Sequence, residues 1–190
     1  MDFGQYYDLE SYLFDKVCNK FQKLGYLDAF DFFCIVIWKA NRAKSKVAKT
    51  LLSSGAKSLD DAVKTLTSDI YRQLTAEDRL RVLWKARFRL PMASAILTVL
   101  YPHDFTVYDR RVCDILHDFH SLSDVSNFDR LWLGYKDFKG KVEKETPKKL
   151  TLRDKDRYLW GKSRYEQLKH DLDSGFIKDN SNTRQNKKID

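Results

Sequence analysis

The chain has 190 residues, of which 43% are hydrophobic and 14% aromatic, with only seven glycines and three prolines. This composition indicates one packed domain, and it excludes a fibrous or disordered chain and two domains of ordinary size. Lys and Arg number 35 against 27 acidic residues, and the net charge of +8 favours a polyanionic partner such as nucleic acid. No apolar run approaches the roughly 20 residues of a membrane helix, so no membrane partner is expected.

The N-terminus and the cysteines predict an intracellular protein. Residues 1–4 lack the basic stretch and apolar core of a signal peptide. Cys18, Cys34 and Cys113 are odd in number and far apart in apolar surroundings, which predicts buried reduced thiols in the cytoplasm, the nucleoid or the nucleus. Three cysteines are too few for a four-cysteine iron–sulfur cluster, and no pair has zinc spacing. We therefore expect no metal and no other cofactor.

Hydrophobic periodicity predicts helices from the start of the chain. Residues 8–24 place five apolar side chains on one side, namely Leu9, Leu13, Val17, Phe21 and Leu24. The segment from Asp28 to Trp38 is apolar nearly all round, which is typical of a buried strand or a central helix. We predict a helix, because good helix formers continue through Leu52 before Gly55 breaks the run.

Capping residues mark the later helices. Ser58, Thr75 and Thr151 each precede an Asp by three residues, and Pro91 suits the first turn of a helix that Pro102 ends. Two further helices are expected to begin at Asp109 and after Ser126. With no alternating strand pattern longer than four residues, the sequence predicts one compact all-α domain over residues 1–172. Residues 173–190 are polar and are expected to form a disordered tail.

Two stretches are basic and contain no acid, residues 38–49 and 79–89. A solvated helix face explains either stretch alone. Two of them in one small domain favour contacts to DNA phosphates, because unopposed charge persists where an anion neutralises it. The residues expected to contact DNA are Arg42, Lys85, Arg87, Arg89 and Arg111.

Residues 87–98 and 106–112 read as a tight turn, an apolar helix, a short loop and an Asp at the mouth of another helix. This order resembles the helix-hairpin-helix DNA glycosylase superfamily (HhH-GPD) over roughly residues 28–120. In that family a glycine-containing hairpin precedes an alanine-rich helix, and a β-branched pair leads into the catalytic aspartate. The separation of Ala93 and Asp109 matches the family's spacing, so the resemblance implies the family's compact all-α fold.

By this resemblance, Asp109 is the catalytic acid. Cleavage of an N-glycosidic bond builds positive charge on the deoxyribose, and a nearby carboxylate stabilises that charge and orients water. A helix N-terminus keeps such a carboxylate ionised. The competing interpretation is that Asp109 only caps its helix.

The chain departs from the family pattern in two places. Arg87-Phe88-Arg89 stands where the family hairpin has glycines, so either the turn is looser or the two arginines reach the phosphate with their side chains. The lysine nucleophile of strand-cutting members would fall at Pro91 or its neighbours. The resemblance therefore implies base removal without strand cleavage.

Lys39 and Asn41 occupy the place where family members put polar residues that face the lesion or fill the gap left by a flipped base. The resemblance thus places both at the border of a base pocket. A lysine at the end of so apolar a helix can equally extend to solvent, and if desolvated near the site it can act as a nucleophile.

The last helix is both aromatic and basic. Tyr158, Trp160 and Tyr165 lie among basic residues, and core packing of these rings is favoured over DNA contact. The four histidines form no metal-spaced set and are expected at the surface.

The sequence thus predicts a DNA N-glycosylase-like protein that recognises a damaged or modified base in duplex DNA and hydrolyses its N-glycosidic bond without strand cleavage. Two other classes stay open. One is a non-catalytic DNA-binding module on the same scaffold, and the other is a protein-interaction domain with an incidental basic surface.

Overall fold

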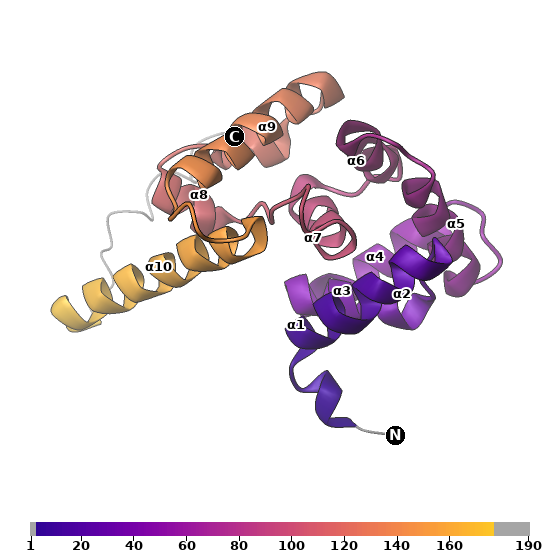
Figure 1. Cartoon of the computed structure of the whole chain (residues 1–190), viewed down its shortest axis with the longest axis horizontal. Coiled ribbons are helices and arrows are strands. Elements are labelled where there is room, and N and C mark those ends of the chain that lie inside the picture. The colour runs from indigo at the N-terminus through magenta and orange to yellow at the C-terminus, as the bar shows by residue number, and fades with distance from the viewer. Residues whose placement is uncertain (1–2, 177–190) are drawn as a thin grey trace, which may run out of the picture.

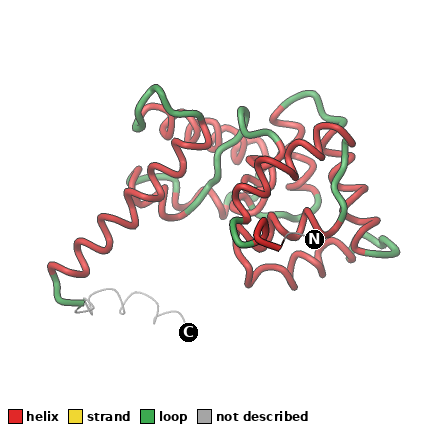
Figure 2. Tube along the Cα trace, turned by 60° about the horizontal axis from the view of Figure 1, so that its bottom comes forward, coloured by secondary structure: helices red, strands yellow, loops and turns green. Residues whose placement is uncertain are grey.

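The computed structural model describes residues 3–176, and every regular element in that range is helical (Figure 2). The prediction of an all-α fold is therefore confirmed. None of the described helices is both long and apolar enough to cross a membrane. The α-helices are α1 (Leu9–Tyr12), α2 (Cys18–Leu24), α3 (Ala29–Ala40), α4 (Lys44–Leu52), α5 (Leu59–Tyr71), α6 (Ala76–Lys85), α7 (Leu90–Leu100), α8 (Arg110–Leu116), α9 (Phe128–Lys144) and α10 (Leu152–Asp173).

Four shorter helical turns complete the fold. Three are 3-10 turns, η1 (Phe3–Tyr6), η3 (Asn41–Ala43) and η4 (His120–Asp124). The fourth, η2 (Leu13–Val17), is π-helical and joins α1 to α2. Helix α10 ends close to the expected residue 172, and residues 177–190 of the predicted tail lie outside the described residues.

The predicted caps form as expected. The side chains of Ser58, Thr75 and Thr151 each accept a hydrogen bond of 3.0 to 3.1 Å from the backbone N–H of the Asp three residues later. These bonds satisfy N–H groups that a helix start leaves without a backbone partner. The helix after Ser58 has 13 residues. Helix α9 begins after Ser126, as expected, and Asn127 caps it.

Two boundaries differ from the expectation near the N-terminus. The helix from Asp28 does form, but it ends at Ala40, whose φ of −164° and ψ of 89° leave the helical region. The 3-10 turn η3 follows, and an α-helix resumes only at α4, so the predicted continuous run to Leu52 is wrong. Leu24, expected on a buried face, is 49% exposed because the left-handed Gly25 ends α2 directly after it.

Helix α7 is the centre of the core. Nine of its eleven residues are buried, and it packs against α2, α3 and α6. Figure 1 shows α7 between the N-terminal helices α2 to α6 and the C-terminal helices α8 to α10. Helix α10 packs mainly on α8. The ends of α3, α8 and α10 consequently approach one another on one side of α7.

The cysteines are free thiols. Cys34 and Cys113 are buried, as expected, and burial raises the pKa of each thiol to about 11. Cys18 is only half-buried, and its Sγ lies 3.9 Å from the Leu100 carbonyl oxygen. The raised pKa values leave both buried thiols protonated and unreactive at neutral pH.

Candidate functional site

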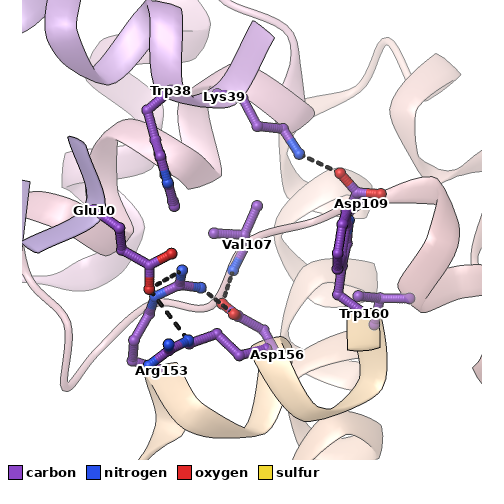
Figure 3. A pocket seen from close by; sticks show the side chains of 10 residues that line it. Glu10, Trp38, Lys39, Val107, Asp109, Arg153, Asp156 and Trp160 are labelled. Atoms are coloured by element: carbon purple, nitrogen blue, oxygen red, sulfur yellow. Dashed lines mark hydrogen bonds and ion pairs between the residues drawn. The ribbon is translucent and has the colours of Figure 1, made fainter. Parts of the chain in front are cut away.

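A pocket of about 420 Å³ lies between α1, the end of α3, the start of α8 and the first half of α10. We call it the interhelical pocket (Figure 3). Its volume is within the usual range of sites for small organic ligands. The residues that line it are Glu10, Trp38, Lys39, Val107, Asp109, Val112, Arg153, Asp156, Arg157 and Trp160.

Lys39 and Asp109 form an ion pair on this pocket. The Lys39 Nζ donates to Asp109 Oδ2 at 2.5 Å, as Figure 3 shows, and the two side chains are 12% and 26% exposed. Seventy residues separate them in the sequence. The structure therefore brings together the residue predicted as the catalytic acid and one of the two residues predicted to border the base pocket.

Asp109 is fixed by the helix that follows it. Its backbone is extended, and its Oδ1 accepts a hydrogen bond of 3.0 Å from the N–H of Arg111, which makes it the N-cap of α8. The cap engages one carboxylate oxygen and leaves the other, Oδ2, directed at Lys39. The two roles considered for Asp109, helix cap and site residue, are compatible in this geometry.

The segment that leads to Asp109 is held by buried polar groups. Tyr135 donates its hydroxyl to the carbonyl of Thr106 at 2.7 Å and accepts from the N–H of Thr106 at 3.0 Å. Asp156 Oδ2 accepts from the N–H of Val107 at 3.0 Å and lies 3.3 Å from Thr106 Oγ1. Helices α9 and α10 thus fix the backbone three and two residues before Asp109.

Lys39 is positioned by the packing of α3. Phe32, Cys34, Ile35 and Val36 bury the middle of this helix, which packs against α7. The helix ends one residue after Lys39, so the lysine lies in its last turn, where a helix favours positive charge. The amine reaches across the pocket to Asp109 instead of extending to solvent.

The floor of the pocket is a charge cluster around the buried Asp156. Arg153 contacts Asp156 and Glu10, the latter at 2.9 Å, and Arg157 lies 3.2 Å from Glu10. Burial raises the pKa of Asp156 to about 6, although the charge of Arg153 opposes this shift. The buried Nε of Arg153 has no hydrogen-bond partner. These contacts tie α10 to α1 and close the pocket from below.

Two tryptophans provide aromatic walls. Trp38 projects from α3 toward the pocket, and Trp160 lies beside Asp109 (Figure 3). Trp160 is 41% exposed, so the prediction that it packs in the core is wrong. Tyr158 and Tyr165 are also exposed, at 47% and 70%. Only the inner part of α10 is covered by α8 and α9, which leaves these rings at the surface.

The pocket is electrically balanced within itself. Its lining includes the cations Lys39, Arg153 and Arg157 and the anions Glu10, Asp109 and Asp156. Because three charges of each sign offset one another, the lining suits an uncharged aromatic group better than a phosphate. The excess positive charge of the protein therefore lies outside the pocket.

The other predicted site residues do not line the pocket. Asn41 is exposed, and its Oδ1 accepts a hydrogen bond of 3.0 Å from Lys44. Arg42 is also exposed, on the turn after α3. Arg111 donates to Gln167 Oε1 at 3.1 Å and lies over the ring of Trp160.

The predicted hairpin is the turn between α6 and α7. Lys85, Arg87 and Arg89 are exposed there, and Arg87 has a left-handed backbone with φ of 64°. A second hollow of about 330 Å³ lies against this turn and the segment 123–126. The turn therefore keeps a backbone conformation that glycine adopts without strain, although it contains no glycine.

Fewer basic side chains of residues 79–89 are without an acidic partner than the sequence indicates. Arg79 pairs with Asp104 at 3.0 Å, and Arg81 pairs with Glu77 and Asp129. Tertiary packing and helical spacing bring acids from outside the stretch to these two arginines. At the end of the stretch, Lys85 and Arg87 form no ion pair within residues 3–176, and Arg89 lies 3.6 Å from Asp124.

The floor residues Glu10, Arg153 and Asp156 were not predicted as site residues. In α10 the pocket residues Arg153, Asp156, Arg157 and Trp160 follow the spacing of one helix face, and this is the signal that identifies them. Glu10 carries no comparable signal, because it reaches the site through the packing of α1. Among the described residues, no group of three His, Cys, Asp or Glu side chains is arranged to hold a metal ion.

Compared with known proteins, the chain matches no family model, and no curated protein or solved structure matches it. The resemblance to the helix-hairpin-helix glycosylases therefore stays a prediction that rests on the residues themselves.

Proposed function

We propose that this chain is a DNA N-glycosylase-like protein of the helix-hairpin-helix kind. It takes a damaged or modified base from duplex DNA into the interhelical pocket and hydrolyses the N-glycosidic bond. The observation that carries this proposal is the ion pair of Lys39 with Asp109 on a pocket with aromatic walls. Lys39 and Asp109 were predicted separately from the sequence. If both belong to one catalytic site, their side chains must lie close together.

The hairpin supports the proposal. Arg87 takes the left-handed conformation in the turn that precedes α7, where the family has glycine. This favours a retained hairpin in which the exposed side chains of Arg87 and Arg89 contact the phosphate. Within residues 3–176, Arg42, Lys85 and Arg87 make no ion pair with an acid, and Arg89 has only an exposed contact of 3.6 Å with Asp124. Such free cations bind DNA by displacing its counterions.

The pocket suits the departing base. Trp38 and Trp160 offer indole faces for stacking, and the balanced charge of the lining does not repel an uncharged ring. Asp109 stabilises the positive charge that develops on the sugar and orients the attacking water. The ion pair with Lys39 holds the Asp109 carboxylate in place. Water as nucleophile yields an abasic sugar and leaves the strand intact.

A non-catalytic DNA-binding module is the second candidate. The hydrogen bonds of Asp109 favour this candidate, because both carboxylate oxygens already have partners, Arg111 N–H and Lys39 Nζ. A purely structural ion pair and cap needs no further role. The same basic hairpin would then bind DNA without base release.

The first experiment compares the affinity for a duplex with a stable abasic-site analogue and for undamaged duplex at the same salt concentration. We expect preference for the analogue and a steep loss of affinity with salt. Equal affinity for both duplexes supports the non-catalytic module. No binding to either duplex contradicts the proposed function.

The second experiment screens base release from duplexes that each carry one modified base. Asp109→Asn should abolish release and leave DNA affinity unchanged or higher, because the variant keeps the shape of the side chain and removes its charge. Asp137→Asn, at an exposed position of α9, is the matched control and should release base normally. Unchanged turnover by Asp109→Asn would overturn the catalytic role.

A further inference from the structure

The outer face of α10 carries exposed aromatic rings. Tyr158 and Tyr165 are 47% and 70% exposed, and they lie on one face of the helix, two turns or about 11 Å apart along its axis. Figures 1 and 2 show the C-terminal half of α10 extending away from the other helices. Within residues 3–176 neither ring stacks on another ring, and neither hydroxyl forms a hydrogen bond. Packing of the chain therefore does not explain these rings.

A cation follows each aromatic residue of α10 by four positions. The three pairs are Tyr158 with Lys162, Trp160 with Arg164, and Tyr165 with Lys169. Side chains four residues apart are neighbours on the surface of a helix. The Arg164 guanidinium accordingly lies over the Trp160 ring, 5.1 Å from its centroid. Each ring thus has a positive charge beside it.

Acids oppose this positive charge only weakly. Between residues 158 and 169 the charged side chains are three cations and a single acid, Glu166. Glu166 lies 3.6 Å from Lys162, and both side chains are about half exposed, so their attraction is small. Within residues 3–176, Arg164 and Lys169 form no ion pair. The outer face therefore combines aromatic surface with cations that lack acidic partners.

We propose that the outer face of α10 binds an unpaired nucleic-acid strand. Bases stack on the exposed rings of Tyr158 and Tyr165, and the neighbouring cations neutralise the phosphates. The strand has to be unpaired, because the bases of a duplex stack on one another and leave no face for a side chain. This binding goes beyond the proposed function and does not depend on it, since neither Asp109 nor Lys39 takes part.

The charges disfavour a second copy of α10 as the occupant of this face. In a parallel pair of these helices, Arg164 would lie against Lys169 of the other copy. In an antiparallel pair, Lys162 would lie against Lys169, and this repulsion offsets the attraction between Arg164 and Asp171. Neither arrangement gains net attraction between charges, whereas the phosphates of a strand attract each of these cations.

Binding of a labelled oligothymidylate to the full chain, followed by fluorescence anisotropy, tests the proposal. Tyr165→Leu keeps an apolar side chain but removes the ring, so the affinity should fall about fivefold or more. Tyr165→Phe keeps the ring and should bind as the parent does. Tyr7→Leu, at a position that is 97% exposed near the N-terminus, is the matched control and should leave the affinity unchanged. Thermal melting checks that each variant is folded.

Two further measurements address the phosphates and the bases separately. Arg164→Gln should lower the slope of log affinity against log salt by about 0.7, and Lys57→Gln, at an exposed position before α5, should leave it unchanged. An oligonucleotide that carries 5-iodouracil should crosslink under ultraviolet light to Tyr158 or Tyr165. Oligouridylate should bind as oligothymidylate does, because stacking and phosphate contacts do not read the sugar. Polyglutamate has the charge without the rings and should bind far more weakly.

The outcomes separate this proposal from the proposed function. No binding of oligothymidylate, equal affinity of Tyr165→Leu and the parent, or equally tight binding of polyglutamate overturns the assignment of α10. Sedimentation that shows a dimer without bound oligonucleotide also overturns it. Tyr165→Leu should bind the duplex with the abasic-site analogue as the parent does. Binding of that duplex without binding of the single strand refutes only the role of α10, and the reverse refutes only the proposed function.

Discussion

The backbone N–H of Tyr108 donates a hydrogen bond of 2.9 Å to Ser94 Oγ, so the chain after α7 returns along the helix toward its beginning. Ser94 lies five residues after Arg89, which corresponds to about 8 Å along the helix axis. Asp109 follows Tyr108 directly and is carried to the hairpin end of α7. This return brings the segment that carries Asp109 back toward the basic turn before α7.

Ser94→Ala should destabilise the protein. Ser94 is fully buried, and its removal leaves the Tyr108 N–H without an acceptor. An unsatisfied buried donor costs about 1–3 kcal/mol, and urea unfolding should show this loss. Ser45→Ala, at an exposed position of α4, is the control and should change the free energy of unfolding by less than about 0.5 kcal/mol. An equal loss of unfolding free energy in both variants would contradict a stabilising role for the hydrogen bond between Tyr108 and Ser94.

Arg87→Gly should affect stability and DNA binding in opposite directions. The φ of 64° strains an arginine and suits glycine, so the free energy of unfolding should rise by about 1 kcal/mol. Loss of the cation should weaken DNA binding, and the slope of log affinity against log salt should shrink by about 1. Arg87→Lys should keep the binding without gaining stability. An unchanged salt dependence in Arg87→Gly would exclude a phosphate contact.

Asp156→Asn should change the pH dependence of stability. Burial raises the pKa of Asp156 to about 6 from the ordinary 3.8, so the folded chain holds this proton more tightly than the unfolded chain. The resulting stabilisation is complete below about pH 4 and is lost as the pH rises through about 6. Because the amide does not titrate, Asp156→Asn should gain up to about 3 kcal/mol relative to the parent between these limits.

Urea unfolding at several pH values measures this difference. Asp137→Asn, at an exposed position of α9, should show a difference from the parent that stays constant with pH. A constant difference for Asp156→Asn as well would mean that the carboxyl titrates in the folded protein as it does in the unfolded chain.

Two glycines of α9 should respond differently to alanine. Nothing lies within 4 Å of a Cβ added at Gly140, so Gly140→Ala should stabilise the helix by about 0.5–1 kcal/mol. A Cβ at Gly134 would lie 2.6 Å from Leu122 Cδ1, and the buried Leu122 would have to move. Thermal melting should therefore show a gain for Gly140→Ala only. An equal gain at Gly134 would mean that Leu122 repacks freely.

The sequence by itself determined the helical class and most helix starts. Ser58, Thr75 and Thr151 were identified correctly, because a cap depends on atoms within one helical turn. The basic stretches were also evident from the sequence, but the acids that pair with their arginines were not. Arg79 is paired with Asp104, 25 residues away, and only the packing of the chain creates that contact.

Only the tertiary structure decided how the candidate site is assembled. Lys39 and Asp109 were each candidates from the sequence, but their pairing depends on the end of α3 and the start of α8 lying at the same pocket. Glu10 and Arg153 meet across almost the whole chain to close the pocket floor. Helix caps follow from local hydrogen bonds, whereas a pocket follows from which helix faces pack together, and that choice is made by the whole core at once.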